Sequence, residues 1–326
     1  MVISIALGPK FIAFLRRREY GQHIRDVLPT HEGKQGTPTM GGLLIVGSMA
    51  VPFLILSNYS TPALAVFLVT LGCAAIGFVD DFIKLTHRRS LGLPGRAKLA
   101  LLALITCGVG WIAHHREFDT HVYLPVVNSR IPLSWAWYVL LFFIIAGAAN
   151  GVNLTDGLDG LAAGTAIIAI FTFTAMNVIG YIRSGPVGQR SEVLLDHSIL
   201  GAALVGATIG FLWYNAFPAE VFMGDTGAMA LGGALGAFAI MNKVEFLLLL
   251  IGGIFLIEAL SVIIQVVSFK YRGRRPFLMT PIHYHFEMKA WSETKIMVRF
   301  WILCAILCAL AFVLYYRYYF RFFRGG

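Results

Sequence analysis

One polar segment stands out in a chain that is otherwise short of charge. It reads NGVNLTDGLDG, covers residues 150–160 and lies between two long apolar runs. Four polar residues recur in it at every third position: Asn150, Asn153, Asp156 and Asp159. Side chains of this kind hydrogen-bond a nucleoside or ribose, or hold a cation. The interspersed glycines predict a turn with close backbone approach, although a capped loop between two helices has a similar composition.

A second segment, GFVDDFIKL, places Asp80 and Asp81 at the end of an apolar run, with Lys84 one helical turn later. On a helix, Asp80 and Lys84 are neighbours at i,i+4, and Asp81 and Lys84 at i,i+3. This spacing predicts that the lysine holds one carboxylate while the other stays free. Adjacent carboxylates suit proton transfer or metal binding. The alternative is the charged end of a membrane helix that reaches water.

A third segment, WYNAFPAEVFMGDTGAM, leads into a glycine-rich run. Asp225 is predicted to lie at a helix start, where a carboxylate caps the helix or binds Mg²⁺. Phe222 beside it is a candidate for stacking on a base, and Asn215 is a further polar candidate in the same loop.

The segment RGRRPFLMTPIHYHFEMKAW carries two candidate histidines, His283 and His285. Two histidines at i,i+2 are weak support for a metal site, because no third ligand completes it. The arginines before them suit phosphates or lipid headgroups, but they also fit the usual excess of basic residues on the inner side of a membrane.

The segment HEGKQGTPTMGG contributes Lys34 and Thr39. A lysine followed by a Gly/Thr turn suits a phosphate, although the P-loop pattern is absent. The same residues also make an ordinary entry into a helix.

The chain that positions these segments is a polytopic membrane protein. It has 326 residues, of which 58% are hydrophobic and 13% charged, with a mean hydropathy of +0.75. Soluble domains are nearer a quarter charged. Ten apolar segments predict an all-α integral membrane protein with about ten transmembrane helices. They cover residues 1–15, 40–57, 62–79, 97–113, 132–149, 160–182, 198–214, 226–241, 244–268 and 296–316.

We expect a single transmembrane domain over residues 1–326, with a first span that is only partial. The four cysteines lie inside apolar runs, which indicates small buried side chains rather than disulfides or a zinc site. The net charge of +9 suits anionic lipids or substrates, and no basic tail indicates nucleic acid.

Lysine and arginine are distributed unequally between the two sets of loops. The set that begins with 16–39 holds 16 of them and the other set 8. The positive-inside rule makes the first set cytoplasmic and both termini external. All the polar segments above then lie on the cytoplasmic face. Such a grouping predicts metal-assisted phosphoryl transfer between a large anionic substrate and a lipid phosphate.

Five segments together resemble one known family, the phospho-N-acetylmuramoyl-pentapeptide transferases. They are KQGTPTMGG, GFVDDFIK, NGVNLTDGLDGL, VFMGDTGA and TPIHYHFEMKAW, in the family's order over residues 34–291. The acidic segments are shared with the wider superfamily of polyprenyl-phosphate N-acetylhexosamine-1-phosphate transferases. The resemblance implies a homodimeric ten-helix enzyme of the bacterial inner membrane with a cytoplasmic active site. It would transfer phospho-MurNAc-pentapeptide from UDP-MurNAc-pentapeptide to undecaprenyl phosphate with Mg²⁺, giving lipid I and UMP.

The resemblance also implies roles for individual residues. Asp225 is similar to the Mg²⁺ ligand, and the catalytic set would be Asp80, Asp81, Asp225, His283 and His285. Substrate-binding residues would be Lys34, Thr39, Lys84, Asn150, Asn153, Asp156, Asp159, Asn215, Phe222 and Gln265. The chain departs from the family's three consecutive histidines, because the middle one is Tyr284. A tyrosine keeps an aromatic donor but loses the charge switch of histidine near pH 7.

Other interpretations remain open at this point. A sister transferase would load a different UDP-N-acetylhexosamine. A transporter would place charges at mid-depth and show repeats, neither of which is apparent in the sequence. A membrane scaffold without catalysis is the third. Within the transferase interpretation, direct displacement by the lipid phosphate competes with a two-step route through an aspartyl-phosphate.

Overall fold

The computed structural model describes residues 1–17, 36–87, 91–124, 127 and 129–319. The chain is almost entirely helical in this part. The helices are α1 (Val2–Arg17), α2 (Gly42–Leu56), α3 (Thr61–Thr86), α4 (Gly95–His115), α5 (Ala136–Thr155), α6 (Leu161–Arg183), α7 (Glu192–Asn215), α8 (Gly224–Met241), α9 (Leu248–Ile251), α10 (Gly253–Arg272), α11 (Ile282–Glu287), α12 (Glu293–Leu314) and the π-helical η2 (Tyr315–Tyr319). Two short strands, β1 (His121–Leu124) and β2 (Ser129–Pro132), form an antiparallel hairpin.

Each of the ten predicted apolar segments contains a helix, which confirms the all-α membrane class. Seven of the described helices are long and apolar enough to cross a membrane by length and composition, and α2 is a shorter apolar helix. The segment predicted at 244–268 is not one continuous helix. It is interrupted at Gly252, between α9 and α10. The count of ten spans stays a prediction.

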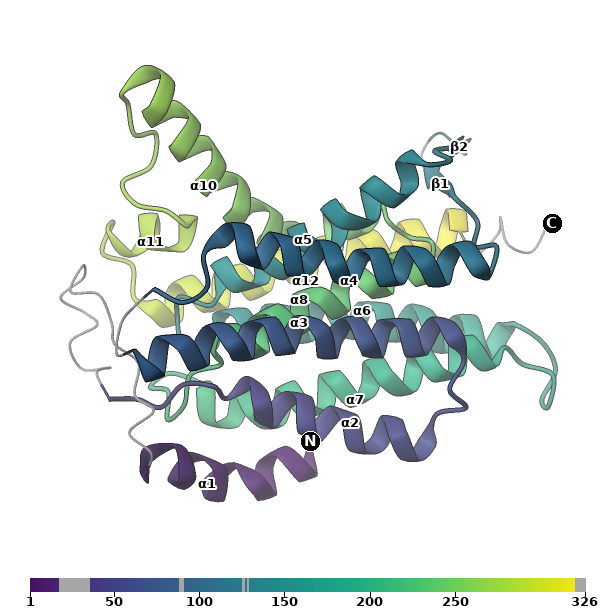
Figure 1. Cartoon of the computed structure of the whole chain (residues 1–326), viewed down its shortest axis with the longest axis horizontal. Helices are drawn as coiled ribbons and strands as arrows, with labels where there is room; N and C mark the ends of the chain where they lie inside the picture. Colours follow the sequence, from purple (N-terminus) through teal and green to yellow (C-terminus); the bar gives the residue numbers. More distant parts are fainter. Residues whose placement is uncertain (18–35, 88–90, 125–126, 128, 320–326) are drawn as a thin grey trace.

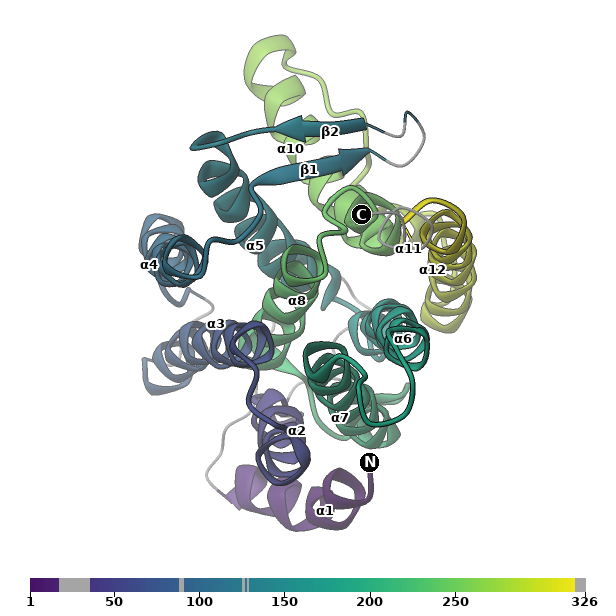
Figure 2. The same ribbon diagram turned by 90° about the vertical axis from the view of Figure 1, so that its right-hand side faces the viewer.

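Helix α8 occupies the centre of the bundle. Figure 2 looks along most of the helices and shows α8 in the middle of the bundle, with α3, α5 and α6 around it. Residues 226–241 are all buried. Glycine and alanine predominate in this helix, and small side chains allow neighbouring backbones to approach closely. Asp225 lies in the first turn of α8, so packing of this helix also determines the place of that carboxylate.

The closest approach near the site is between α3 and the start of α8. A Cβ atom on Gly77 of α3 would overlap the carbonyl oxygen of Asp225 and approach Thr226 N to 2.6 Å. Backbone atoms cannot move aside as a flexible side chain can. Gly77, about one helical turn before Asp80 and Asp81 on α3, therefore allows the backbone at Asp225 to lie directly against α3.

If the chain has the activity that its resemblance implies, we expect Gly77→Ala to lower turnover by about 10-fold or more, because about 1 Å of displacement at a reacting group is enough for such a loss. Gly108→Ala is the matched control, since Gly108 lies in α4 with nothing within 4 Å of its added methyl. Steady-state rates and thermal unfolding in detergent check both variants. If Gly77→Ala and Gly108→Ala had equal turnover rates, the start of α8 would be able to shift without loss of activity.

The two ends of the bundle differ. Helix α10 leans away from the other helices, and α11 lies near its base at one end of the molecule (Figure 1). The hairpin β1–β2 lies at the opposite end, with His121 paired to Pro132 and Leu124 to Ser129. The end of α3, the start of α4, the end of α5 and the start of α8 meet at the α11 end, and they carry the candidate site.

Candidate active site

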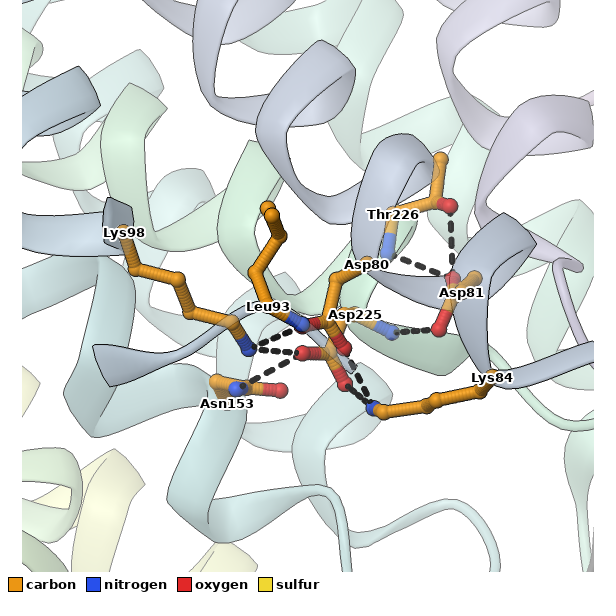
Figure 3. Close-up of polar contacts among 8 residues, drawn as sticks. All are labelled: Asp80, Asp81, Lys84, Leu93, Lys98, Asn153, Asp225 and Thr226. Atoms are coloured by element: carbon orange, nitrogen blue, oxygen red, sulfur yellow. Dashed lines mark hydrogen bonds and ion pairs between the residues drawn. The ribbon is translucent and has the colours of Figure 1, made fainter. Parts of the chain in front are cut away.

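Four charged side chains from three helices form one compact cluster (Figure 3). Lys84 Nζ lies 2.6 Å from Asp80 Oδ2 and 2.8 Å from Asp225 Oδ1. Lys98 Nζ lies 3.0 Å from Asp80 Oδ1 and 2.6 Å from Asp225 Oδ2. Asp80 also accepts a hydrogen bond from the Leu93 N–H at 2.7 Å. Each carboxylate therefore receives two ammonium groups, which offsets the cost of holding it away from water.

Asp81 has different hydrogen-bond partners from Asp80. Its Oδ1 accepts from the backbone N–H of Asp225 at 3.1 Å. Its Oδ2 accepts from the N–H of Thr226 at 2.9 Å and from the Thr226 hydroxyl at 2.7 Å. The two backbone N–H groups lie in the first turn of α8, where they have no partner within the helix, so Asp81 on α3 caps α8. The prediction that this carboxylate stays free was wrong.

The polar segment 150–160 is half helical. Helix α5 continues to Thr155, so the turn begins only at Asp156, later than the glycines suggested. The helical part separates its two asparagines. Asn153 Nδ2 approaches Asp225 Oδ2 at 3.4 Å, whereas Asn150 Nδ2 donates to Ala146 O within its own helix at 2.8 Å. Asn153 is thus part of the cluster, and Asn150 has a local helical partner.

Asp156 follows α5 and sits next to the cluster without an ammonium partner among its described hydrogen bonds and ion pairs. Its side chain is partly open at the surface but is surrounded by protein atoms. This burial raises the pKa of Asp156 to about 8, with further contributions from the negative charges of Asp225 and Asp81. At neutral pH, Asp156 is therefore largely protonated and able to donate a hydrogen bond.

A raised carboxyl pKa makes folding take up a proton, so the contribution to stability falls as the pH rises from about 4 to about 8. Asparagine cannot ionise. We expect Asp156→Asn to raise the unfolding temperature of the metal-free protein by about 2–4 °C at pH 8 and by less at pH 5. Thermal scans in detergent between pH 5 and 9 measure this, with the exposed Glu220→Gln as control. A difference that does not grow with pH would contradict the assignment.

Two of the predicted binding residues, Asp159 and Asn215, make hydrogen bonds to the backbone of loops around the cluster. Asp159 Oδ2 accepts from Ala219 N at 3.1 Å. Asn215 accepts from Gly160 N at 3.1 Å and donates to Val221 O at 2.9 Å. These bonds join the α5–α6 turn to the α7–α8 loop. They stabilise the walls of the site, and a role for Asp159 and Asn215 in binding stays a prediction.

The entry to α2 is fixed in the same way. Phe222 donates its N–H to Pro38 O at 2.8 Å and accepts from Gly41 N at 2.9 Å. The hydroxyl of Thr39 lies against the start of α8, 2.9 Å from where a Cβ on Gly224 would be. Thr39 is therefore near Asp225. Lys34, the other candidate in this segment, lies outside the described residues.

The two histidines lie apart from the acidic cluster. His283 is fully buried, with Nδ1 3.1 Å from Glu258 Oε1. His285 Nδ1 accepts from Leu278 N at 3.1 Å. Burial and the positive charge of Lys289 lower the pKa of His285, which agrees with a neutral ring that accepts at Nδ1. In the described part of the chain, no hydrogen bond or ion pair joins either histidine to Asp80 or Asp225.

Two more residues of this region have backbone partners. Gln265 makes paired hydrogen bonds with the backbone of Phe277, at 3.0 and 3.1 Å, and so anchors the segment after α10. The Tyr284 hydroxyl donates to Gly157 O at 3.4 Å, and burial raises the pKa of this hydroxyl. Tyr284 thus remains a donor, as expected for tyrosine in the place of a histidine.

Three residues of this region, Lys98, Thr226 and Glu258, were not predicted from the sequence patterns. Lys98 is a lone lysine at the start of an apolar run, where it counted only toward topology. Glu258 is the one acid inside the run 244–268 apart from Glu245 near its start, and a charge in such a run is a signal of function.

The carboxylates of the cluster fit a small, hard cation. Asp80, Asp81 and Asp225 each offer an oxygen, and these oxygens lie within 4.8 Å of one another. Carboxylate oxygens are the ligands that Mg²⁺ prefers. Asp81 already uses both oxygens at the start of α8, whereas Asp80 and Asp225 are held by mobile ammonium groups that can make room.

A helical membrane protein with carboxylates that are paired with lysines at one end fits a class of membrane transferases, and comparison with known proteins agrees. The model of glycosyl transferase family 4 matches residues 63–243. Signature 1 of the phospho-N-acetylmuramoyl-pentapeptide-transferases matches residues 34–46.

Relatives that match most of the chain identify the family more closely. The phospho-N-acetylmuramoyl-pentapeptide-transferase of Bacillus cytotoxicus is 47% identical over 305 residues, covering 92% of this chain and 90% of the relative. The enzyme of Bacillus anthracis is 46% identical over the same shares of both chains. The chain belongs to the phospho-N-acetylmuramoyl-pentapeptide-transferase family.

Proposed function

We propose that the chain transfers phospho-MurNAc-pentapeptide from UDP-MurNAc-pentapeptide to undecaprenyl phosphate, giving lipid I and UMP in the first membrane step of peptidoglycan synthesis. The family membership supports this function over a transporter or a scaffold. The observation that carries it is the pair Asp80 and Asp225, bridged by Lys84 and Lys98. Such an arrangement suits a reaction in which two phosphate groups must meet.

The proposed chemistry is a direct displacement. An oxygen of the lipid phosphate forms a bond to the β-phosphorus of the nucleotide sugar, and the bond from that phosphorus to the bridging oxygen breaks, so that UMP leaves. Lys84 and Lys98 would exchange their carboxylate partners for phosphate oxygens and offset the negative charge. Asp80 is the candidate to take a proton from the lipid phosphate.

Asp225, with Asp80 beside it, would hold Mg²⁺. The ion, when bound, supplies positive charge to the diphosphate and lowers the repulsion between the two anions. Asp81 would keep the start of α8 in place. The nucleoside half of the substrate would contact a wall made by Thr39, Asn153, Asp156, Asp159, Asn215 and Phe222, together with Lys34. Gln265 would lie near the sugar or the peptide.

Reconstitution in detergent tests the proposal. The protein is mixed with UDP-MurNAc-pentapeptide, undecaprenyl phosphate and Mg²⁺, and UMP is measured. We expect UMP release that needs both the lipid and the cation. Release with UDP-GlcNAc instead would indicate the sister transferase. A phosphorylated Asp80 or Asp81, trapped with nucleotide substrate alone, would favour the two-step route.

We further propose that the cluster faces the cytoplasm, that both termini lie outside, and that the enzyme is a homodimer. The excess of basic residues in one set of loops supports the orientation. Labelling of Arg190→Cys from outside intact cells, without labelling of Arg274→Cys, is the expected result in a background with Cys107 replaced. Light scattering in detergent measures the oligomeric state, and a monomer would refute the dimer.

A further inference from the structure

A pair of ionisable side chains is fully buried away from the acidic cluster. Glu258 of α10 and His283 of α11 are each 0% exposed, and Glu258 Oε1 lies 3.1 Å from His283 Nδ1. A buried carboxylate or imidazole is costly unless it is paired. Each of the two side chains therefore depends on the other, because replacing either one would leave its partner buried without this contact.

The pairing determines which ring nitrogen carries the proton. A carboxylate oxygen accepts, so the Nδ1–H of His283 donates to Glu258 and Nε2 is the ring nitrogen that faces away from it. Nε2 is buried and has no hydrogen-bond partner among the described residues. In metal and catalytic sites, a carboxylate behind a histidine fixes the ring in the same way.

The His283 ring packs against Gly157 in the turn between α5 and α6. A Cβ atom on Gly157 would overlap His283 Nε2 and would lie 2.7 Å from the hydroxyl of Tyr284. Gly157 has no positive φ, so its backbone would accept a side chain if space allowed. The glycine is required by the ring that packs against it. This turn begins at Asp156 and includes Asp159, both of which belong to the predicted site.

We propose that Glu258 is a positioning residue of the transferase site: it fixes the ring of His283, and the ring supports the turn at Gly157 that places Asp156 beside the acidic cluster. The proposal rests on the proposed function for its kinetic consequence. It also changes the role of His283 from a group that touches substrate to one that acts through the turn, in keeping with its complete burial.

Three variants separate positioning from bulk stability. Glu258→Leu keeps volume but removes the acceptor, and we expect kcat to fall about 10–100-fold. Glu258→Gln keeps an acceptor oxygen for Nδ1–H, and we expect it to retain turnover within about threefold. Gly157→Ala adds a methyl that would displace the ring at Nε2, and we expect its kcat to fall by about as much as that of Glu258→Leu. Gly147→Ala in α5, with nothing within 4 Å of the new methyl, is the control.

The ¹⁵N NMR spectrum of histidine-labelled protein gives a readout that does not depend on turnover. His283→Asn identifies the signal of His283 by its loss. We expect a ring protonated at Nδ1 in the wild type and in Glu258→Gln, and a changed tautomer in Glu258→Leu. The double variant Glu258→Leu/Gly157→Ala should lose little more than either single variant, because both act through one ring.

Two results would overturn the proposal. One is an unchanged His283 signal in Glu258→Leu. The other is a Glu258→Gln variant as slow as Glu258→Leu, since charge rather than orientation would then matter. If the wild type released no UMP with either nucleotide sugar, the proposed function would fail, but the NMR comparison would still test the pair without substrate.

Discussion

Asp225→Asn is expected to lower the rate of UMP release by about 10³-fold or more while the helical fold persists. Asparagine has nearly the same shape, but it is neutral and a poor partner for the two ammonium groups of Lys84 and Lys98. It also removes the carboxylate that would hold Mg²⁺. Loss of one preorganised charged group at a phosphoryl-transfer centre costs about 10²–10³ in rate, and loss of the ligand adds to this.

The measurement is single-turnover UMP release at saturating lipid, with circular dichroism and thermal unfolding to verify the fold. Glu220→Gln is the matched control, because it neutralises an exposed carboxylate in the loop that leads into α8. We expect its rate to be within about twofold of the wild type. A fast Asp225→Asn enzyme would mean that the reaction centre lies elsewhere.

Lys98→Met is expected to have the second largest effect, a loss of about 10²-fold in kcat. The methionine keeps the length and apolar stem of lysine but leaves Asp80 and Asp225 with one ammonium group between them. Phosphate charge in the transition state would then be poorly offset. Steady-state kinetics with both substrates varied separate a loss in kcat from a loss in binding.

Arg96→Met is the control for this variant. Arg96 is exposed on the same helix, two residues before Lys98, so its replacement removes the same charge from α4 without touching the cluster. We expect the control to be nearly as fast as the wild type. If both variants were equally slow, the effect would come from the overall charge of this face and not from the bridge.

The sequence was enough to predict the apolar helices and the shared end on which the polar segments meet. Long apolar runs leave the bilayer as the only suitable environment, and helices that alternate in direction bring every second loop to the same side. The position of Asp225 in the first turn of α8 was also predictable, because a carboxylate before a glycine-rich helical run is typical of a helix start.

The pairings inside the site were not predictable from local patterns. Lys98 and Asp225 are 127 positions apart, and Glu258 and His283 are 25 apart, so no helical period links them. The segment 150–160 shows a subtler limit. Its regular spacing suggested that the four polar side chains lie together. Helix α5 instead continues into the segment, so Asn150 and Asn153 have different hydrogen-bond partners. Tertiary packing decided where the helix ended.

The buried position of α8 has a consequence for how the protein is made. In the part of the chain that the structure describes, α8 is not among the seven helices that qualify as spans by length and composition. With 18 residues it is about 27 Å long, a little less than the hydrocarbon thickness of a bilayer. Such a segment is stabilised little by contact with lipid and mainly by packing against neighbouring helices. Its principal neighbours α3 and α5 precede it in the chain, so the ribosome delivers the helix that bears Asp225 after those partners have already entered the membrane.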